Sequence, residues 1–151
     1  MRKIIVTGGL GFIGSNLIDL LIKNKYYVIN IDKVSYSSNF YNVKEFKKSK
    51  KYKFFKIDIK DKKISKILFK FKPAAIFNLA AETHVDRSID NPEIFIKTNI
   101  LSFFNFINLI KKFLFKLNKR KKNNFRFIQV STDEVYGSIK KGKALENSEI
   151  S

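Results

Sequence analysis

The sequence predicts an α/β protein with a doubly wound parallel sheet. Short runs rich in β-branched and aromatic residues alternate with longer amphipathic stretches, and a glycine-rich turn joins the first run to the first such stretch. Strands that alternate with helices pair in parallel, because each helix returns the chain to the same end of the sheet. The chain has 151 residues, a length that fits one domain with its own core, so we expect a single domain over 1–151.

Five segments have the composition of strands, and three have the pattern of helices. The predicted strands are 3–8, 26–32, 53–59, 74–80 and 125–132. The predicted helices are about 12–23, 61–71 and 92–117. Asn91 and Pro92 open the third helix as a cap residue and a first-turn proline. The basic stretch 116–124 predicts a solvated loop, and the tail 138–151 predicts an unfinished loop.

The chain carries a formal net charge of +18 and has a pI near 10.0. Three interpretations are open: a compositional bias toward Lys, Ile, Asn and Phe, a weak general attraction to polyanions, or a dedicated nucleic-acid site. The lysines are spread over nearly every segment expected to be exposed, and no nucleic-acid-binding motif is recognisable. The sequence therefore favours the compositional bias, and we expect no specific nucleic-acid partner.

The composition also bears on metals and membranes. The chain has no Cys and one His, His84, so we expect neither disulfides nor a metal site, and a cytoplasmic protein. Glycines interrupt the apolar run at the N-terminus, which predicts no signal peptide. Thr98 to Ile110 is uncharged over 13 residues, fewer than the roughly 20 that a membrane span needs. We therefore expect a buried helix and no membrane partner.

The glycine-rich turn "TGGLGFIGSNL" places Gly8, Gly11 and Gly14 between the first strand and the first helix. This context, with an acid at the end of the second strand, is typical of dinucleotide binding. Gly8 permits the tight turn, Gly11 lets the backbone approach a pyrophosphate, and Gly14 lets the helix pack closely. The first N–H groups of the helix then face the phosphates.

Asp32 is that acid. We expect it to accept hydrogen bonds from both hydroxyls of the adenosine ribose and to repel a 2′-phosphate, which favours NAD over NADP. Lys33 follows it directly and weakens that exclusion.

The stretch "FRFIQVSTDEVYG" at 125–137 is largely apolar through Val130 and then becomes polar with Ser131, Thr132, Asp133 and Glu134. Two neighbouring carboxylates repel each other, and enclosing them costs desolvation energy. A purely structural purpose is therefore hard to supply, and the pair indicates proton transfer.

The Gly-x-x-Gly-x-x-Gly turn, "NLAAETHVDRS" and "STDEVYG" together resemble the extended short-chain dehydrogenase/reductase family, and within it the dTDP-glucose 4,6-dehydratases. The resemblance runs from residue 1 to about 137. Related sugar-nucleotide epimerases have small or hydroxyl residues where Asp133 and Glu134 stand, and GDP-mannose dehydratases carry a different pair. The resemblance implies NAD-dependent dehydration of dTDP-glucose to dTDP-4-keto-6-deoxyglucose by a homodimer.

The resemblance also implies residue roles. Glu134 would remove the C5 proton as general base, Asp133 would protonate the departing C6 hydroxyl, and Thr132 would hydrogen-bond the C4 oxygen. Thr83 would lie near the sugar. The positions expected to contact NAD are Gly8, Gly11, Phe12, Ile13, Gly14, Asp32, Lys33, Asp58, Ile59, Leu79, Ala80, Ala81 and Thr98. Three further residues match the family motif and are expected to brace the site wall, namely His84, Asp86 and Arg87.

Members of this family also need a Tyr-x-x-x-Lys pair on one helix beyond the threonine. Tyr136 and Lys140 match this spacing, but Gly137 favours a loop, where positions i and i+4 do not share a face. We therefore expect the chain to be the N-terminal portion of a dehydratase, without its last strands and sugar-nucleotide domain, and inactive by itself. Two alternatives stay open: a non-catalytic NAD-binding remnant, and another sugar-nucleotide epimerase or dehydratase.

Overall fold

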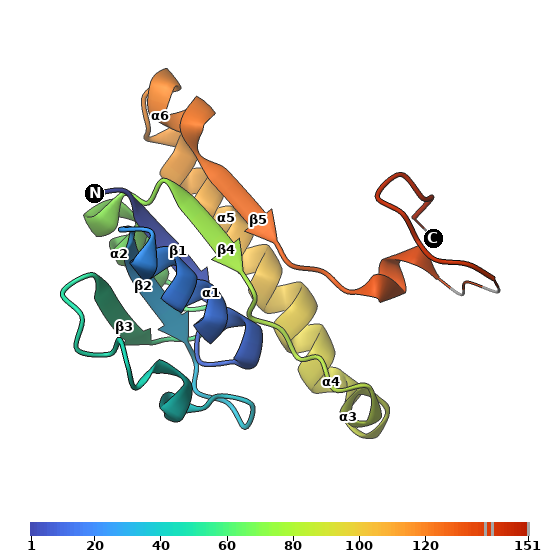
Figure 1. Cartoon of the computed structure of the whole chain (residues 1–151). Coiled ribbons are helices and arrows are strands. Elements are labelled where there is room, and N and C mark those ends of the chain that lie inside the picture. The colour runs from blue at the N-terminus through green and yellow to red at the C-terminus, as the bar shows by residue number, and fades with distance from the viewer. Residues whose placement is uncertain (138, 140, 151) are drawn as a thin grey trace.

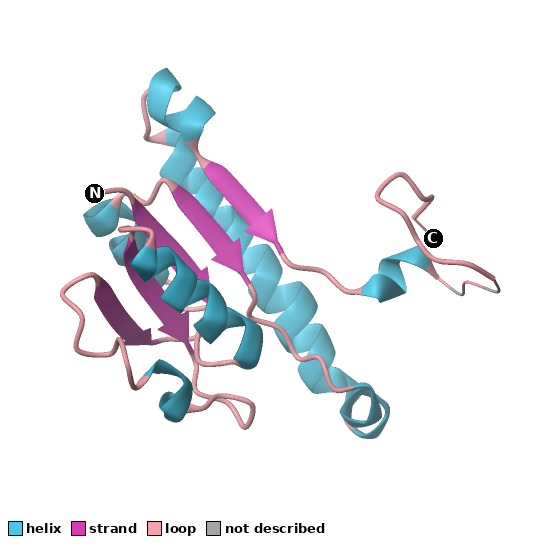
Figure 2. Ribbon diagram, viewed as in Figure 1, coloured by secondary structure: helices cyan, strands magenta, loops and turns pink. Residues whose placement is uncertain are grey.

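The computed structural model describes residues 1–137, 139 and 141–150, and it has a sheet with helices on both faces (Figure 1, Figure 2). Within these residues the sheet has five strands in the order β3-β2-β1-β4-β5, and all neighbours are parallel. The strands are β1 (Lys3–Thr7), β2 (Tyr27–Asp32), β3 (Tyr52–Lys56), β4 (Ala75–Asn78) and β5 (Arg126–Gln129). The predicted fold class is confirmed.

The register brings the carboxyl ends of the strands to one edge of the sheet. Thr7 at the end of β1 lies opposite Ile31 of β2 and Asn78 of β4. Asn78 in turn lies opposite Gln129, the last residue of β5. The loops that follow these strands therefore start side by side, which is where α/β sheets bind ligands.

The three predicted helices are present. Helix α1 (Phe12–Lys23) has the predicted bounds, and α2 is Lys63–Phe71. The third predicted helix consists of three consecutive elements, which are α4 (Pro92–Phe95), the π-helical η2 (Ile96–Ser102) and α5 (Phe103–Phe115). Asn91 occupies the N-cap position of α4 without a side-chain capping bond. In the described residues, four short elements lie outside the predicted set: η1 (Phe40–Val43), α3 (Val85–Asp90), η3 (Asp133–Tyr136) and α6 (Lys119–Asn124).

The solvated loop predicted at 116–124 is wrong in part, because residues Lys119–Asn124 form the short helix α6. The Asn118 side chain caps this helix by accepting a hydrogen bond from the Lys121 N–H at 3.0 Å. An asparagine before a helix is a standard capping signal, but the dense positive charge of the segment concealed it.

The core lies on the two faces of the sheet, because successive strand side chains point to opposite sides. On one face, strand residues such as Ile5, Ile29 and Ile76 pack with α2 and α5. On the other face, Ile4 and Val6 belong to a cluster with buried residues of α1. Leu10 of the glycine turn also belongs to the second cluster, so the turn is anchored in the core.

The expectation of a buried helix at 98–110 is only partly right. Ser102, Phe106 and Ile110 are buried at a spacing of four residues, while Ile100 and Phe104 are 60% and 62% exposed. Among the described residues, the continuous helix Pro92–Phe115 is long and apolar enough to cross a membrane by length and composition only. Its buried face packs into the core of the sheet. The expected absence of a membrane partner stays a prediction.

Candidate dinucleotide-binding cleft

The glycine turn between β1 and α1 is shaped by close backbone contacts. Gly8 has φ +68°, a conformation that side chains rarely adopt, and a Cβ there would lie 2.8 Å from the Leu79 carbonyl oxygen. A Cβ on Gly14 would lie 2.3 Å from the Gly8 carbonyl oxygen, so α1 packs against the turn itself. A Cβ on Gly11 would have only that same oxygen within 4 Å, at 3.3 Å. Gly11 therefore leaves open space where a ligand can approach the backbone.

Gly9 is a fourth glycine of this turn that the sequence pattern did not single out. A Cβ on Gly9 would lie 2.2 Å from the Asn30 side-chain oxygen. Asn30 is fully buried, and its Nδ2 donates a hydrogen bond to the Tyr52 hydroxyl at 2.8 Å. Burial raises the pKa of the Tyr52 hydroxyl, an effect that the bond from Asn30 opposes. The double glycine was the available signal, since the second position has no room for a side chain.

Asp32 is buried, with 6% of the residue exposed, and three donors of the protein hold its carboxylate. Its Oδ2 accepts from the Leu10 N–H at 3.0 Å, and its Oδ1 accepts from the Val34 N–H and the Ser38 hydroxyl, each at 2.8 Å. A carboxylate has about four acceptor positions. By this count one position remains, on Oδ2, whereas we expected Asp32 to accept from two ribose hydroxyls.

The loop after Asp32 is strained at Val34. This residue has φ 62°, which is a true outlier for a β-branched side chain. Such a conformation costs about 1–3 kcal/mol and persists only where the surroundings enforce it. Here the Val34 N–H is fixed by the Asp32 carboxylate. The loop geometry is therefore tied to the acid at the strand end.

A cleft of about 470 Å³ lies where the loops leave the carboxyl ends of the strands. Every residue predicted to contact NAD lines it, and so do Thr83 and Thr132. Lining residues that were missed are Ile31, Ser35, Ser37, Ser38, Ile57, Val130 and Ser131. The cluster of serines directly after Asp32 was a visible signal for three of them.

A chain of polar side chains, buried at Thr7 and Asn78 and exposed at Gln129, joins the strand ends next to the cleft. The Thr7 hydroxyl donates to Asn78 Oδ1, and Asn78 Nδ2 donates to Gln129 Oε1 at 2.7 Å. The Ala80 N–H donates to the same Thr7 hydroxyl at 3.3 Å. These bonds join the ends of three strands and fix the start of the loop that carries Ala80.

The segment after β5 is the least enclosed part of the candidate site. Thr132 lines the cleft but is exposed, and Glu134 is exposed and is not among the lining residues. The side chain of Asp133 lies outside the described residues. Figure 1 shows this segment leaving the sheet toward the C-terminus. The structure therefore brings Thr132, but not Glu134, to the predicted cofactor residues.

The Tyr136–Lys140 match has no helical support in the described residues. Tyr136 is the last residue of the single turn η3, and Gly137 follows with φ 64°. Lys140 lies outside the described residues. The expectation that this pair is not the catalytic one stays a prediction.

Of the three motif residues expected to brace the site wall, His84 and Arg87 contact the loop after β2. The Arg87 guanidinium lies 3.8 Å from the centre of the Tyr36 ring. The Tyr36 and His84 rings are 5.7 Å apart. Asp86 is exposed in the first turn of α3. His84, which precedes α3, and Arg87, within α3, thus connect this helix to the loop after β2.

The strand order, the glycine turn and the acid at the end of β2 together define a Rossmann-type dinucleotide-binding fold. Within that class, the chain belongs to the family described as GDP-mannose 4,6 dehydratase, which it matches over residues 5–151.

Individual relatives narrow the resemblance further. A dTDP-glucose 4,6-dehydratase from Salmonella typhimurium is 44% identical over 148 residues, which are 97% of this chain and 41% of that relative. A solved dTDP-glucose 4,6-dehydratase from Bacillus anthracis in complex with NAD gives a TM-score of 0.80 at 33% identity, covering 100% of this chain and 44% of that one. The solved dTDP-glucose 4,6-dehydratase from Streptomyces venezuelae, with NAD bound, gives a TM-score of 0.82 at 32% identity. The match covers 99% of this chain and 45% of that one.

The chain therefore spans about two fifths of the length of the curated relative described above. The predicted resemblance to dTDP-glucose 4,6-dehydratases is confirmed. The predicted cofactor, NAD, is the one bound in both solved relatives.

Proposed function

We propose that these residues form the cofactor-binding part of an NAD-dependent nucleotide-sugar 4,6-dehydratase that converts dTDP-glucose to dTDP-4-keto-6-deoxyglucose. One observation carries the proposal: the glycine turn, Asp32 and Thr132 all line a single cleft of about 470 Å³. The 44% identical relative from Salmonella typhimurium, named dTDP-glucose 4,6-dehydratase, supports the choice of reaction and sugar nucleotide.

The residues of the cleft fit NAD. The open space beside Gly11 admits a pyrophosphate against the first N–H groups of α1. The acceptor position remaining on Asp32 suits one hydroxyl of the adenosine ribose, and its charge disfavours a 2′-phosphate. When bound, NAD supplies the acceptor and later the donor of a hydride. Of the lining residues, Asp58 and Ile59 would hold the adenine, and Leu79, Ala80 and Ala81 would hold the nicotinamide half.

The chemistry assigned to the chain itself belongs to the segment after β5. Thr132 donates a hydrogen bond to the C4 oxygen of the sugar, Glu134 accepts the C5 proton, and Asp133 protonates the departing C6 hydroxyl. Glu134 is exposed outside the cleft. Its role therefore requires residues 133–137 to lie closer to the cleft when the sugar nucleotide is present. Thr83 is the second hydroxyl of the chain that we assign to the sugar.

We assign residues 1–151 to one NAD-binding domain. The family resemblance supports a cytoplasmic homodimer for the whole enzyme, without a membrane or a specific nucleic-acid partner.

These residues alone are expected not to dehydrate dTDP-glucose. The described residues hold no Tyr-x-x-x-Lys pair on one helix to take the C4 hydroxyl proton, and general-base assistance is typically worth about 10² to 10⁴ in rate. The check is to incubate the purified chain with NAD⁺ and dTDP-glucose and to follow the 4-keto-6-deoxy product. Turnover within tenfold of the Salmonella typhimurium relative would contradict this expectation.

A chimera tests the reaction directly. The 148 aligned residues replace their counterparts in the Salmonella typhimurium relative, which supplies the rest of its own length. We expect the chimera to form the 4-keto-6-deoxy product. In the chimera, Glu134→Gln should retain oxidation at C4 but lose solvent exchange at C5, whereas Asp133→Asn should retain that exchange and lose elimination.

Two outcomes would count against the proposal. A folded chimera that binds NAD⁺ but forms no product would favour a non-catalytic NAD-binding remnant. Normal dehydration by the Glu134→Gln chimera would remove the role assigned to Glu134.

A further inference from the structure

Lys33 and Glu82 form an ion pair beside the cleft. The Lys33 Nζ lies 2.6 Å from Glu82 Oε1 and donates a longer hydrogen bond, of 3.5 Å, to the Thr98 hydroxyl. The Lys33 side chain is 33% exposed and that of Glu82 is 7% exposed. Salt therefore screens this pair much less than it screens ion pairs on the surface.

Glu82 is held in place through its backbone. The Asn99 side chain accepts from the Glu82 N–H and donates to the Glu82 carbonyl oxygen, both at 2.9 Å. Asn99 belongs to the π-helical η2, where the Ser102 hydroxyl donates to the Lys97 carbonyl oxygen at 2.7 Å. Such π-helical turns often occur at functional sites. The structure thus aims a buried carboxylate at the Lys33 ammonium.

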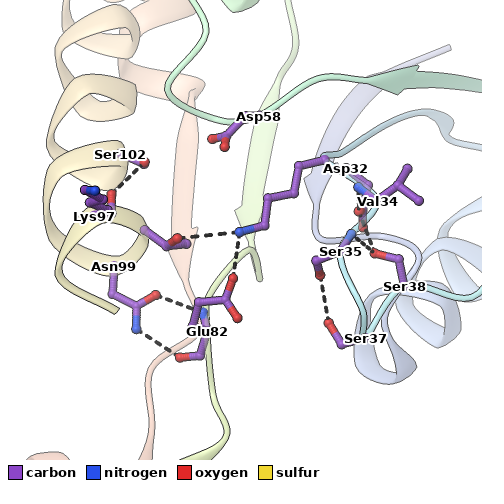
Figure 3. A network of polar contacts seen from close by, with 12 residues as sticks. Asp32, Val34, Ser35, Ser37, Ser38, Asp58, Glu82, Lys97, Asn99 and Ser102 are labelled. Carbon is purple, nitrogen blue, oxygen red and sulfur yellow. Dashed lines mark hydrogen bonds and ion pairs between the residues drawn. The ribbon is translucent and has the colours of Figure 1, made fainter. Parts of the chain in front are cut away.

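The position of the Lys33 ammonium determines how much positive charge lies beside Asp32, the residue before it. Figure 3 shows Glu82 and Asn99 on one side of the network, and Asp32, Ser35 and Ser38 on the other. Asp32 is bonded to Ser38 and the Val34 N–H. The Lys33 ammonium is bonded instead to Glu82 and Thr98, which belong to the segments after β4.

An unpaired ammonium directly after Asp32 would attract the 2′-phosphate that distinguishes NADP from NAD, because lysine acts as a point charge toward phosphate. We propose that Glu82 is a specificity-determining residue: by pairing with Lys33 it withdraws this positive charge and leaves the Asp32 charge to exclude NADP. The inference rests on the proposed NAD function of the cleft and names a second acid that selects the cofactor.

A simple mechanical role for the pair is the competing explanation, since it also connects the loops after β2 and β4. Those loops have a second connection, because Tyr36 contacts both Arg87 and His84. Losing the ion pair would therefore leave the loops joined. A mechanical role predicts equal loss of affinity for both cofactors, whereas a role in specificity predicts a change in their ratio.

The test measures NAD⁺ and NADP⁺ binding to the 151-residue chain by calorimetry, with competition titrations for the weaker cofactor. Glu82→Gln keeps the shape of the side chain and frees the charge of Lys33. We expect the ratio of the two dissociation constants to shift about tenfold toward NADP⁺. The control is Lys33→Met combined with Glu82→Gln, which removes both charges and should restore the preference of the unaltered chain.

Equal weakening of both cofactors by Glu82→Gln, or a control that keeps the shifted ratio, would overturn the inference. If Glu82→Gln does not fold, Asn99→Ala loosens the same carboxylate and should shift the ratio about threefold in the same direction, and an unchanged ratio would again overturn it. If the unaltered folded chain binds neither cofactor, the proposed function fails and this inference with it. If it prefers NAD⁺ and the Glu82→Gln ratio is unchanged, only the inference fails.

Discussion

The two sides of the cleft differ in how firmly the chain holds them. On the side of β1, α1 and β2, the glycine turn packs backbone against backbone, and the Asp32 carboxylate has three protein donors. On the side of β5, Thr132 and Glu134 are exposed. The residues assigned to the cofactor are thus preorganised by local packing, while those assigned to proton transfer are not. Substitutions on the side of β1, α1 and β2 should change stability and the affinity for NAD⁺. Substitutions on the side of β5 should change only the rate of the dehydration.

The largest effect is expected from Gly14→Ala. Its new methyl group would lie 2.3 Å from the Gly8 carbonyl oxygen, so the turn must move. Overpacking of this kind costs about 1–3 kcal/mol, and we expect a loss near the upper end together with loss of NAD⁺ binding. Thermal unfolding and calorimetry provide the two measurements.

Gly11→Ala is the matched control, because its methyl group has one contact, at 3.3 Å. It should keep the unfolding temperature of the unaltered chain but weaken NAD⁺ binding by filling the open space beside the turn. Equal destabilisation by both alanines would show that the turn is not packed as described.

A middle-sized effect is expected from Tyr52→Phe, which removes the partner of the buried Asn30 amide. Leaving such a donor unsatisfied costs about 1–3 kcal/mol. The pKa of Tyr52 is raised above its ordinary value of 10.0 by burial. The stability from this hydroxyl is therefore present below pH 10 and is lost as the pH rises through the raised pKa.

Urea unfolding of both proteins at pH 8 and at about pH 10.5 measures this effect. The advantage of the unaltered chain over Tyr52→Phe should be smaller at the higher pH. An advantage that grows with pH would contradict the assignment of a raised pKa to a buried, protonated hydroxyl.

The smallest effect is expected from Glu134→Gln in the chain alone. Glu134 is exposed and does not line the cleft, and surface substitutions of this kind usually stay within about 0.5 kcal/mol. Thermal unfolding and NAD⁺ affinity should both match the unaltered chain. A clear loss of either would mean that the carboxylate segment is packed against the cleft.

Local sequence patterns predicted the fold and most of the cleft, because the strands, the first helix and the glycine turn are determined mainly by residues close together in the sequence. The bounds of α1 follow from the glycine turn before it and its own apolar period. The cofactor residues directly follow strands whose composition is clear. The role of Gly9 was missed because the Asn30 side chain that fills its space belongs to another strand.

Long-range contacts account for what the sequence did not predict. The partners Lys33 and Glu82 are 49 positions apart, and no local period connects them. Asn99 holds Glu82 from within a π-helical turn that reads as ordinary helix in the sequence. The exposed position of Glu134 was also missed, since the motif alone does not determine which way the segment after β5 runs.

The central claim is that Asp32 selects NAD in this cleft, and binding of NAD⁺ and NADP⁺ to the chain and to Asp32→Asn tests it most directly. The asparagine removes the charge and keeps one oxygen to accept from Val34 and Ser38, while its amide nitrogen replaces Oδ2, the oxygen that accepts from Leu10. We expect the unaltered chain to bind NAD⁺ at least tenfold more tightly than NADP⁺, and the variant to lose most of that preference. Equal binding of both cofactors by the unaltered chain, or an undiminished preference in the folded variant, would contradict the account.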